Sequence, residues 1–140
     1  MKVIAVEINE KSDNEIIKYM KNEKENLIEE LSFKFALDIV KYAQLLEKGN
    51  NQFIARQIMS CGTSIGFNIR EAHKAELKQD YSHKIRIAKK EADELNYLLM
   101  ICKESEGFPD CEKLLNSLDI ITKTLTDIIG DLKPQIGFTR

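Results

Sequence analysis

The chain has 140 residues, of which 43% are hydrophobic and 31% are charged, and its formal net charge is −2. This length suits one domain with a buried core and is too short for two domains of ordinary size. No apolar run approaches the roughly 18 residues that a membrane-spanning helix needs, and no small-residue cleavage site follows the N-terminal apolar residues. We therefore expect a cytoplasmic protein with no membrane partner.

The first 25 residues are expected to form an N-terminal extension, residues 1–25. Residues 1–11 favour β-structure and could form an added strand, contact a partner or be a frayed start. Ser12 and Glu15 have the spacing of a capping box, which is typical of a helix start. Residues 21–26 are polar on every side, so we expect a bend or loop there, before the main fold begins.

The first long helix is expected to run from Asn26, which forms a second capping box with Glu29, to Gly49. Along it, apolar residues recur at spacings of three and four, as on one buried helix face: Ile28, Leu31, Phe35, Ile39, Tyr42 and Leu46. A second apolar stripe lies beside that face: Phe33, Leu37 and Val40. The helix is therefore expected to bury two sides.

A second helix is expected to start near Asn51, and its apolar face consists of Ile54, Ile58, Cys61, Ile65, Ile69 and Ala72. Gly62 and Gly66 lie in the middle of this helix, where each costs about 1 kcal/mol relative to alanine. Because the two glycines are four residues apart and share a face, we expect a neighbouring helix to pack closely against them. Exposure of the backbone to a ligand is the alternative.

The third helix is expected to follow a turn at residues 75–80, although no glycine or proline marks that turn. Its apolar face is formed by Tyr81, Ile85, Ala88, Ala92, Leu95, Leu99 and Cys102. A second stripe is formed by Ile87, Leu98 and Ile101. Gly107 is expected to end the helix.

The fourth helix is predicted to begin at Pro109, which suits the first helical position, and to end near Gly130 and Pro134. Its apolar face consists of Leu114, Leu118, Ile121, Leu125, Ile128 and Leu132. Residues 134–140 show no periodic pattern and are predicted to be a mobile tail.

Four helices with short connections predict an all-α fold, an antiparallel up-down-up-down four-helix bundle that occupies residues 26–133. The second stripes of the first and third helices exceed what one bundle core can bury. They predict a homo-oligomer whose interface contains Phe33, Leu37, Val40, Ile87, Leu98 and Ile101.

No catalytic residue, cofactor or metal site is expected. The three cysteines lie on apolar helix faces and are interpreted as small buried hydrophobes: Cys61, Cys102 and Cys111. His73 and His83 are the two histidines, and Asp80 with His83 supplies one copy of the i, i+3 motif that a di-iron bundle site needs twice. The chain has no Walker sequence, so we also expect no small-molecule substrate and no enzyme activity.

The centre of the chain is basic, because residues 70–90 hold seven lysines and arginines against three acidic residues. The seven are Arg70, Lys74, Lys78, Lys84, Arg86, Lys89 and Lys90. The first three are spaced by four, and such a row of like charges on one helix favours an anionic partner. We interpret the segment as a candidate surface for salt-sensitive, sequence-independent binding of RNA phosphates. An ordinary solvated helix face is the alternative.

Three further polar residues, Asn68, Glu71 and Glu91, are predicted to have a structural role in helix packing. Glu71 or Glu91 could form a hydrogen bond with Asn68 or Thr63 across two helices, since each buried polar group needs a partner.

Three segments, residues 31–40, 61–72 and 87–97, resemble the four-helix bundle protein family whose founding members are encoded in intervening sequences of bacterial 23S rRNA genes. The segment Gly62-Thr-Ser-Ile-Gly-Phe-Asn-Ile-Arg-Glu-Ala72 is its most specific motif, and the resemblance covers about residues 27–130. It implies an antiparallel subunit that assembles into a homopentamer and has no established activity. Relatives serve as accessory proteins to reverse transcriptases of diversity-generating retroelements.

Two positions depart from the family pattern. Ser60 stands where the family often has an arginine, which removes a candidate phosphate contact, and Leu77 stands where the family often has a serine that would cap the third helix. The sequence pI of about 5.8 is also lower than that of the basic retroelement relatives.

Two functional hypotheses follow. The first is a non-enzymatic oligomeric scaffold that binds rRNA or an RNA-handling protein through the basic central segment. The second is an oligomeric protein–protein interaction or accessory module with no nucleic-acid role.

Overall fold

Four α-helices make up the part of the chain that the computed structural model describes, which is residues 10–136, with side chains described for residues 23–132. The helices are α1 (Glu10–Lys48), α2 (Gln52–His73), α3 (Lys78–Glu104) and α4 (Glu112–Ile136). Residues 10–136 contain no strand, so the predicted all-α fold with four helices is confirmed. Within this described part, no helix is both long enough and apolar enough to cross a membrane.

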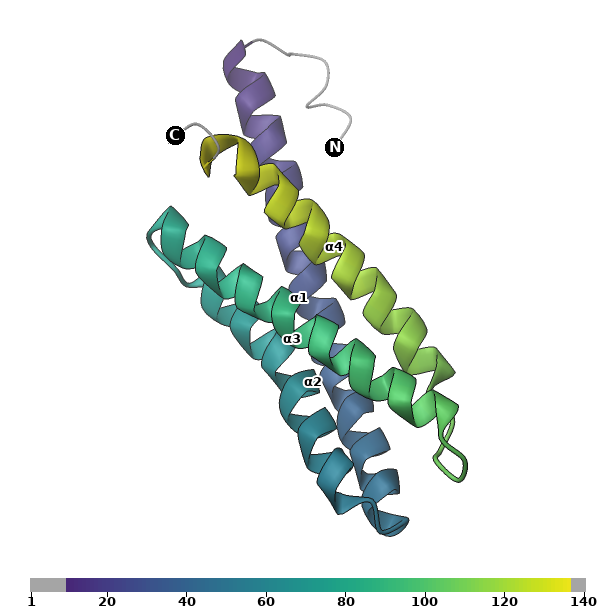
Figure 1. The fold of residues 1–140 in the computed structure, drawn as a ribbon. Helices are drawn as coiled ribbons and strands as arrows, with labels where there is room; N and C mark the ends of the chain where they lie inside the picture. Colours follow the sequence, from purple (N-terminus) through teal and green to yellow (C-terminus); the bar gives the residue numbers. More distant parts are fainter. Residues whose placement is uncertain (1–9, 137–140) are drawn as a thin grey trace.

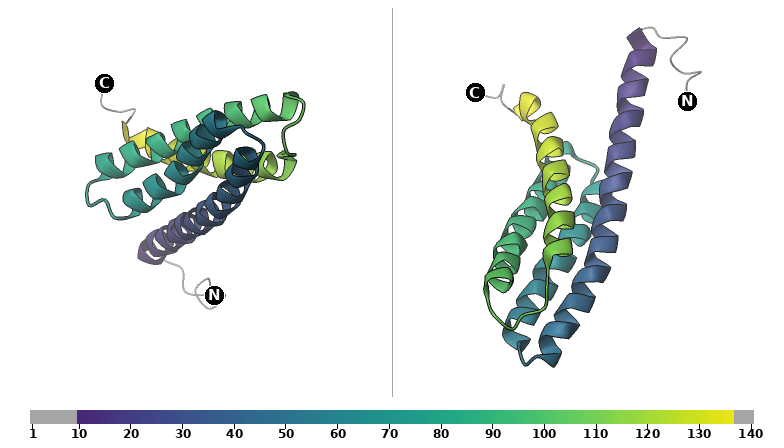
Figure 2. Two further views of the ribbon diagram at one scale, coloured as in Figure 1. Left: turned by 90° about the horizontal axis from the view of Figure 1, so that it is seen from below. Right: turned by 90° about the vertical axis from the view of Figure 1, so that its right-hand side faces the viewer.

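The helices pack in the order in which they follow one another along the chain. The helix α1 packs against α2, α2 against α3, and α3 against α4, while α4 returns to contact α1. Figure 1 shows successive helices side by side, each joined to the next by a short connection between neighbouring ends. In Figure 2, α1 extends beyond the end of the bundle that the other helices form.

The core contains the apolar faces that periodicity predicts. Large side chains with less than 2% of their surface exposed come from all four helices: Ile28, Ile39, Leu46, Ile58, Ile65, Ile69, Ile85, Leu95, Leu99, Leu118, Ile121 and Leu125. A few predicted core residues are only partly buried at its edge: Leu31, Ile54, Cys61, Tyr81 and Leu132. Spacing along each helix therefore identifies the buried face correctly.

The start of α1 differs from the prediction. The helix is continuous from Glu10 to Lys48, so the expected bend at residues 21–26 and the separate helix start at Asn26 are wrong. That segment has no glycine or proline and is rich in lysine and glutamate, which are good helix formers. Lys24 lies 3.9 Å from Asp131 of α4, which ties this turn to the bundle. Residues 1–9, with their β-favouring run, lie outside the described residues.

The helix α4 begins later and ends later than predicted. It starts at Glu112 rather than Pro109, and it continues through Gly130 and Pro134 to Ile136. One glycine costs a helix only about 1 kcal/mol, and a proline in the last turn removes one hydrogen bond, so neither residue must end the helix. The first three residues of the predicted tail are therefore helical, and residues 137–140 lie outside the described part.

The connection between α2 and α3 is shorter than the predicted turn at residues 75–80. Lys74 is the C-terminal cap of α2, and α3 already begins at Lys78. Leu77 occupies the N-cap position of α3 and makes no side-chain capping bond, because its side chain has no polar atom. This end of α3 therefore lacks the cap that the family pattern would supply.

The helices α1 and α2 approach closely at Gly62 and Gly66. A Cβ atom added at Gly62 would lie 2.5 Å from Cγ2 of Ile39, and one added at Gly66 would lie 3.2 Å from Oγ of Ser32. Ile39 and Ser32 are both fully buried in α1. The two glycines thus leave the space that one turn of α1 occupies.

Replacing Gly62 with Ala is expected to destabilise the fold by about 1–2 kcal/mol, because an overpacking cost of about 1–3 kcal/mol exceeds the gain in helix propensity. Gly130→Ala is the matched control. A Cβ atom there would meet nothing within 4 Å, so this change should stabilise α4 by about 1 kcal/mol. Urea unfolding measures both free energies, and equal effects in the two variants would contradict the close packing at Gly62.

Candidate nucleic-acid interface

Two hollows lie end to end between α3 and α4. The first, of about 650 Å³, is lined by Leu77, Lys78, Gln79, Ser82, His83, Arg86 and Leu132. The second, of about 470 Å³, is lined by Arg86, Lys89, Lys90, Asp93, Thr126, Ile129 and Gly130. Because Arg86 lines both, we treat the hollows as one surface and call it the α3–α4 groove.

The α3–α4 groove is positively charged. Among the described residues that line it, four are lysine or arginine and one, Asp93, is acidic. The Asp93 carboxylate lies 2.9 Å from Nζ of Lys89, so its charge is balanced within α3. The groove therefore keeps an excess of cations, which concentrates anions at a concave surface.

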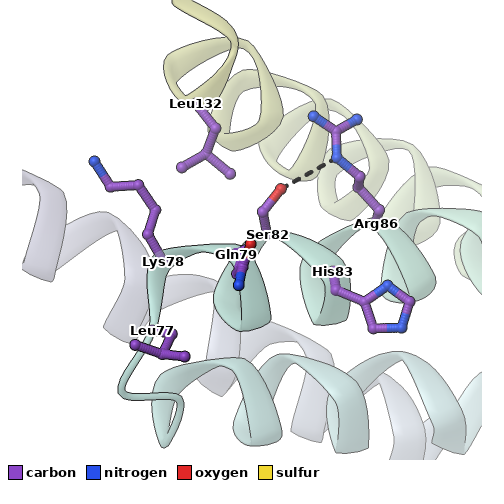
Figure 3. A pocket seen from close by; sticks show the side chains of 7 residues that line it. All are labelled: Leu77, Lys78, Gln79, Ser82, His83, Arg86 and Leu132. Carbon is purple, nitrogen blue, oxygen red and sulfur yellow. Dashed lines mark hydrogen bonds between the residues drawn. The ribbon is translucent and has the colours of Figure 1, made fainter. Parts of the chain in front are cut away.

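Arg86 is held in place by its own helix. Its Nε donates a hydrogen bond of 3.2 Å to Oγ of Ser82, one turn earlier in α3. Figure 3 shows Lys78 and Arg86 on either side of Ser82, with Leu132 of α4 facing them across the first hollow. The ring of His83 points away from Leu132 in the same view. The terminal guanidinium nitrogens of Arg86 thus extend toward α4, beside the hollow.

The remaining basic residues of the 70–90 segment lie elsewhere. Nε of Arg70 is 3.3 Å from a carboxylate oxygen of Glu29, and its guanidinium lies 5.8 Å from the centre of the Phe33 ring. Lys84 is half-buried and lines neither hollow. The predicted row of Arg70, Lys74 and Lys78 along one helix is wrong, because the chain turns between Lys74 and Lys78.

A polar cluster joins α1, α2 and α3 near the start of α3. Nδ1 of His73 lies 2.6 Å from Oε1 of Glu29, and Nε2 of the same ring is buried with no hydrogen-bond partner among the described residues. The His73 ring stacks on Tyr81 with centroids 6.4 Å apart, and the Tyr81 hydroxyl donates a 2.9 Å hydrogen bond to Glu25. The bond from His73 is the main cause of a lowered Glu29 pKa. Sequence reasoning missed this cluster because Glu29 and His73 are 44 residues apart.

Replacing Glu29 with Gln is expected to weaken the dependence of stability on acidic pH. Since the folded pKa of Glu29 lies below its ordinary value of 4.5, the ionised carboxylate stabilises the fold above pH 4.5. That contribution is lost as the pH falls through the folded pKa. Urea unfolding at neutral pH and at about pH 3 should show a smaller loss of stability in the variant than in the wild type.

The control for this experiment is Glu30→Gln, since the Glu30 side chain is 64% exposed and its ion pair with Lys34 lies on the surface of α1. It should lose as much stability in acid as the wild type. An equal acid-induced loss in Glu29→Gln would show that the Glu29–His73 contact contributes nothing to folding.

Cys61 differs from the other two cysteines. Cys102 and Cys111 are buried as predicted, but Cys61 is half-exposed and its thiol lies 3.9 Å from a carboxylate oxygen of Glu94. Burial, followed by the nearby carboxylates of Glu91 and Glu94, raises the pKa of the Cys61 thiol to about 12. One ligand atom from each of these three residues lies within 4.8 Å of the others. The interpretation of Cys61 as a buried hydrophobe is therefore wrong: at neutral pH its protonated thiol faces two carboxylates.

The predicted hydrogen bonds from Glu71 or Glu91 to Asn68 or Thr63 do not form. The buried Asn68 amide donates instead to the carbonyl and hydroxyl oxygens of Ser64, at 2.9 and 3.0 Å. The hydroxyl of Thr63 donates to the carbonyl of Met59 at 2.8 Å. Asn68 and Thr63 therefore satisfy their donors within α2 and leave α3 to pack by shape.

The side chains proposed for an oligomer interface fall into two groups. Phe33 and Leu37 are about half exposed on α1, and Ile101 is exposed on α3. The others are partly buried: Val40, Ile87 and Leu98. Two exposed aromatic residues escaped sequence reasoning, Phe67 on α2 and Tyr97 on α3, because each lies outside its helix's apolar stripe.

The fold and the groove together define a class of protein: a small all-α, four-helix subunit with one concave, positively charged surface. The family model for the 23S rRNA-intervening sequence protein matches residues 24–127, and the chain belongs to that family. A crystal structure of a protein of unknown function from the S23 ribosomal protein family of Bacteroides thetaiotaomicron has a TM-score of 0.72 and 36% identity. The match covers 76% of this chain and 98% of that one. No curated protein matches the chain.

Proposed function

We propose that this protein is a non-enzymatic helical scaffold whose antiparallel four-helix subunits associate with one another and bind RNA along the α3–α4 groove. The observation that carries the proposal is the charge of the groove: four cations line it, and its one described carboxylate is paired with Lys89. The family to which the chain belongs takes its description from an rRNA intervening sequence, which supports RNA as the anion.

Phosphate contacts account for the chemistry of such a groove. Lysine and arginine side chains that neutralise phosphates release condensed counterions, so affinity depends on salt and hardly on sequence. The chain as a whole has a net charge of −2, which disfavours RNA binding over the rest of its surface. Binding is therefore confined to the groove, and association of several subunits would multiply it through simultaneous contacts.

Reversing two charges of the groove tests this function. The double variant Arg86→Glu, Lys90→Glu is expected to weaken binding of an rRNA fragment at least about tenfold and to lower the salt slope of log Kd by about 1. Fluorescence anisotropy at several salt concentrations measures both quantities. Both residues line the groove, and neither contributes to the buried core.

Lys34→Glu provides the matched control, because Lys34 is exposed on α1, outside the groove, and changes the charge in the same way. It should bind RNA nearly as the wild type does. Salt-independent binding, or equal losses in the groove and control variants, would rule out the groove as the RNA site.

A second candidate function is an oligomeric protein–protein interaction or accessory module with no nucleic-acid role. The observation that favours it is the set of large apolar side chains left exposed in a single subunit, among them Phe33, Leu37, Phe67 and Tyr97. Large exposed apolar patches mark interaction sites more often than they occur without function. Both candidates require self-association, and they differ in whether the groove binds RNA.

Self-association is tested by light scattering of the purified full chain. A homopentamer is expected to have a mass of about 80 kDa, five times the 16.1 kDa of one chain. Replacing Phe33 and Leu37 together with Ser should lower the mass, because it removes exposed apolar surface from α1 without touching the core. A mass near that of one chain for the wild type at micromolar concentration would contradict the assembly.

A further inference from the structure

We infer that the RNA bound in the α3–α4 groove is single-stranded and that one of its bases enters the first hollow, between Leu77 and Leu132, while adjacent phosphates lie against Lys78 and Arg86. The inference rests on the proposed function and specifies the form of RNA that the groove selects. It places the entry point for a base at the start of α3.

Leu77 is the first reason. It occupies the N-cap position of α3, where serine, threonine, aspartate and asparagine are preferred and leucine lowers helix stability. Its side chain is 58% exposed, so little packing within the subunit compensates for the lost cap. It does line the first hollow. An apolar side chain that weakens its own helix and faces a hollow is suited to contact a ligand.

The shape of the first hollow is the second reason. Its volume of about 650 Å³ lies within the range of small-molecule pockets, so it has room for one nucleobase with its sugar. Leu132 of α4 faces Leu77 and Lys78 across it (Figure 3) and supplies a second apolar wall. Bases of a duplex are stacked and paired inside it, whereas an unpaired strand can turn a base outward into such a hollow.

The polar lining is the third reason. Ser82 accepts a hydrogen bond from Nε of Arg86, so the hydroxyl hydrogen of Ser82 and the terminal nitrogens of Arg86 can still donate. Gln79, which lines the same hollow, carries both a donor and an acceptor that can pair with a base edge. These groups place phosphate donors beside the hollow and base-reading groups within it.

An acidic amphipathic helix of a partner protein fits the groove less well. Such a helix needs apolar contacts repeated at every turn along its length. The groove offers two leucines at the first hollow and Ile129 at the second, between which the lining is polar or charged. The structure therefore favours a ligand with one apolar unit and several phosphates.

The experiment compares three labelled probes of about 12 nucleotides with the full-length protein: a single RNA strand, the same strand in a duplex, and a ribose-phosphate strand without bases. The single strand is expected to bind about tenfold more tightly than the other two, which is the effect of one well-placed base. Leu77→Ser should reduce the affinity for the single strand about tenfold and leave the affinity for the abasic strand unchanged.

Leu77→Ser also controls for misfolding. Because serine can cap α3, the melting temperature of this variant should equal or exceed that of the wild type, so a weaker affinity would not reflect unfolding. Leu45→Ser removes an equally exposed leucine from α1, outside the groove, and should leave all three affinities unchanged.

Each outcome bears on one claim. Equal affinity for the abasic and base-bearing strands, still abolished by Arg86→Glu with Lys90→Glu, overturns the inference and leaves the proposed RNA function intact. Preference for the duplex overturns it in the same way. Salt-dependent binding of none of the probes overturns the proposed function itself. An acidic amphipathic peptide that outcompetes the single strand and is lost in Leu77→Ser replaces RNA with a protein partner.

Discussion

Two glycines one turn apart on α2 allow the backbone of α1 to come into direct contact with that helix. Ile39 occupies the space at Gly62, and Ser32 occupies the space at Gly66. This contact fixes the height of α1 against α2, because large buried side chains cannot slide along a surface with only two gaps. The same alignment brings Glu29 of α1 opposite His73 of α2. The polar cluster at the start of α3 thus depends on the glycine contact in the middle of the bundle.

The position of α3 divides its charged residues between two surfaces. On the side of α2, Glu91 and Glu94 face Cys61, and their carboxylates help to keep its thiol protonated. On the side of α4, Arg86, Lys89 and Lys90 line the α3–α4 groove. A helix whose overall composition is balanced therefore presents opposite charges to its two neighbours. This separation lets an acidic chain offer a surface to an anionic ligand.

Helix existence and buried faces could be predicted because apolar residues recur every three or four positions over more than 20 residues in each helix. Helix ends could not, because they depend on small local preferences that packing overrides. The polar residues 21–26 continue α1, and Gly130 continues α4, since the cost of each is about 1 kcal/mol or less. Gly62 and Gly66 gave a useful signal because two such costs on one face call for a compensating contact.

The sequence by itself determined that the chain is all-α, which face of each helix is buried, and that the basic residues concentrate between residues 70 and 90. Tertiary structure decided how those basic residues are grouped. It places Arg70 against Glu29 and Phe33, and it assembles Arg86 and Lys90 with Thr126 and Ile129 of α4 into one groove. The physical reason is that periodicity shows which side of a helix avoids water but not which helix will cover it, and hollows form where two such helices fail to meet.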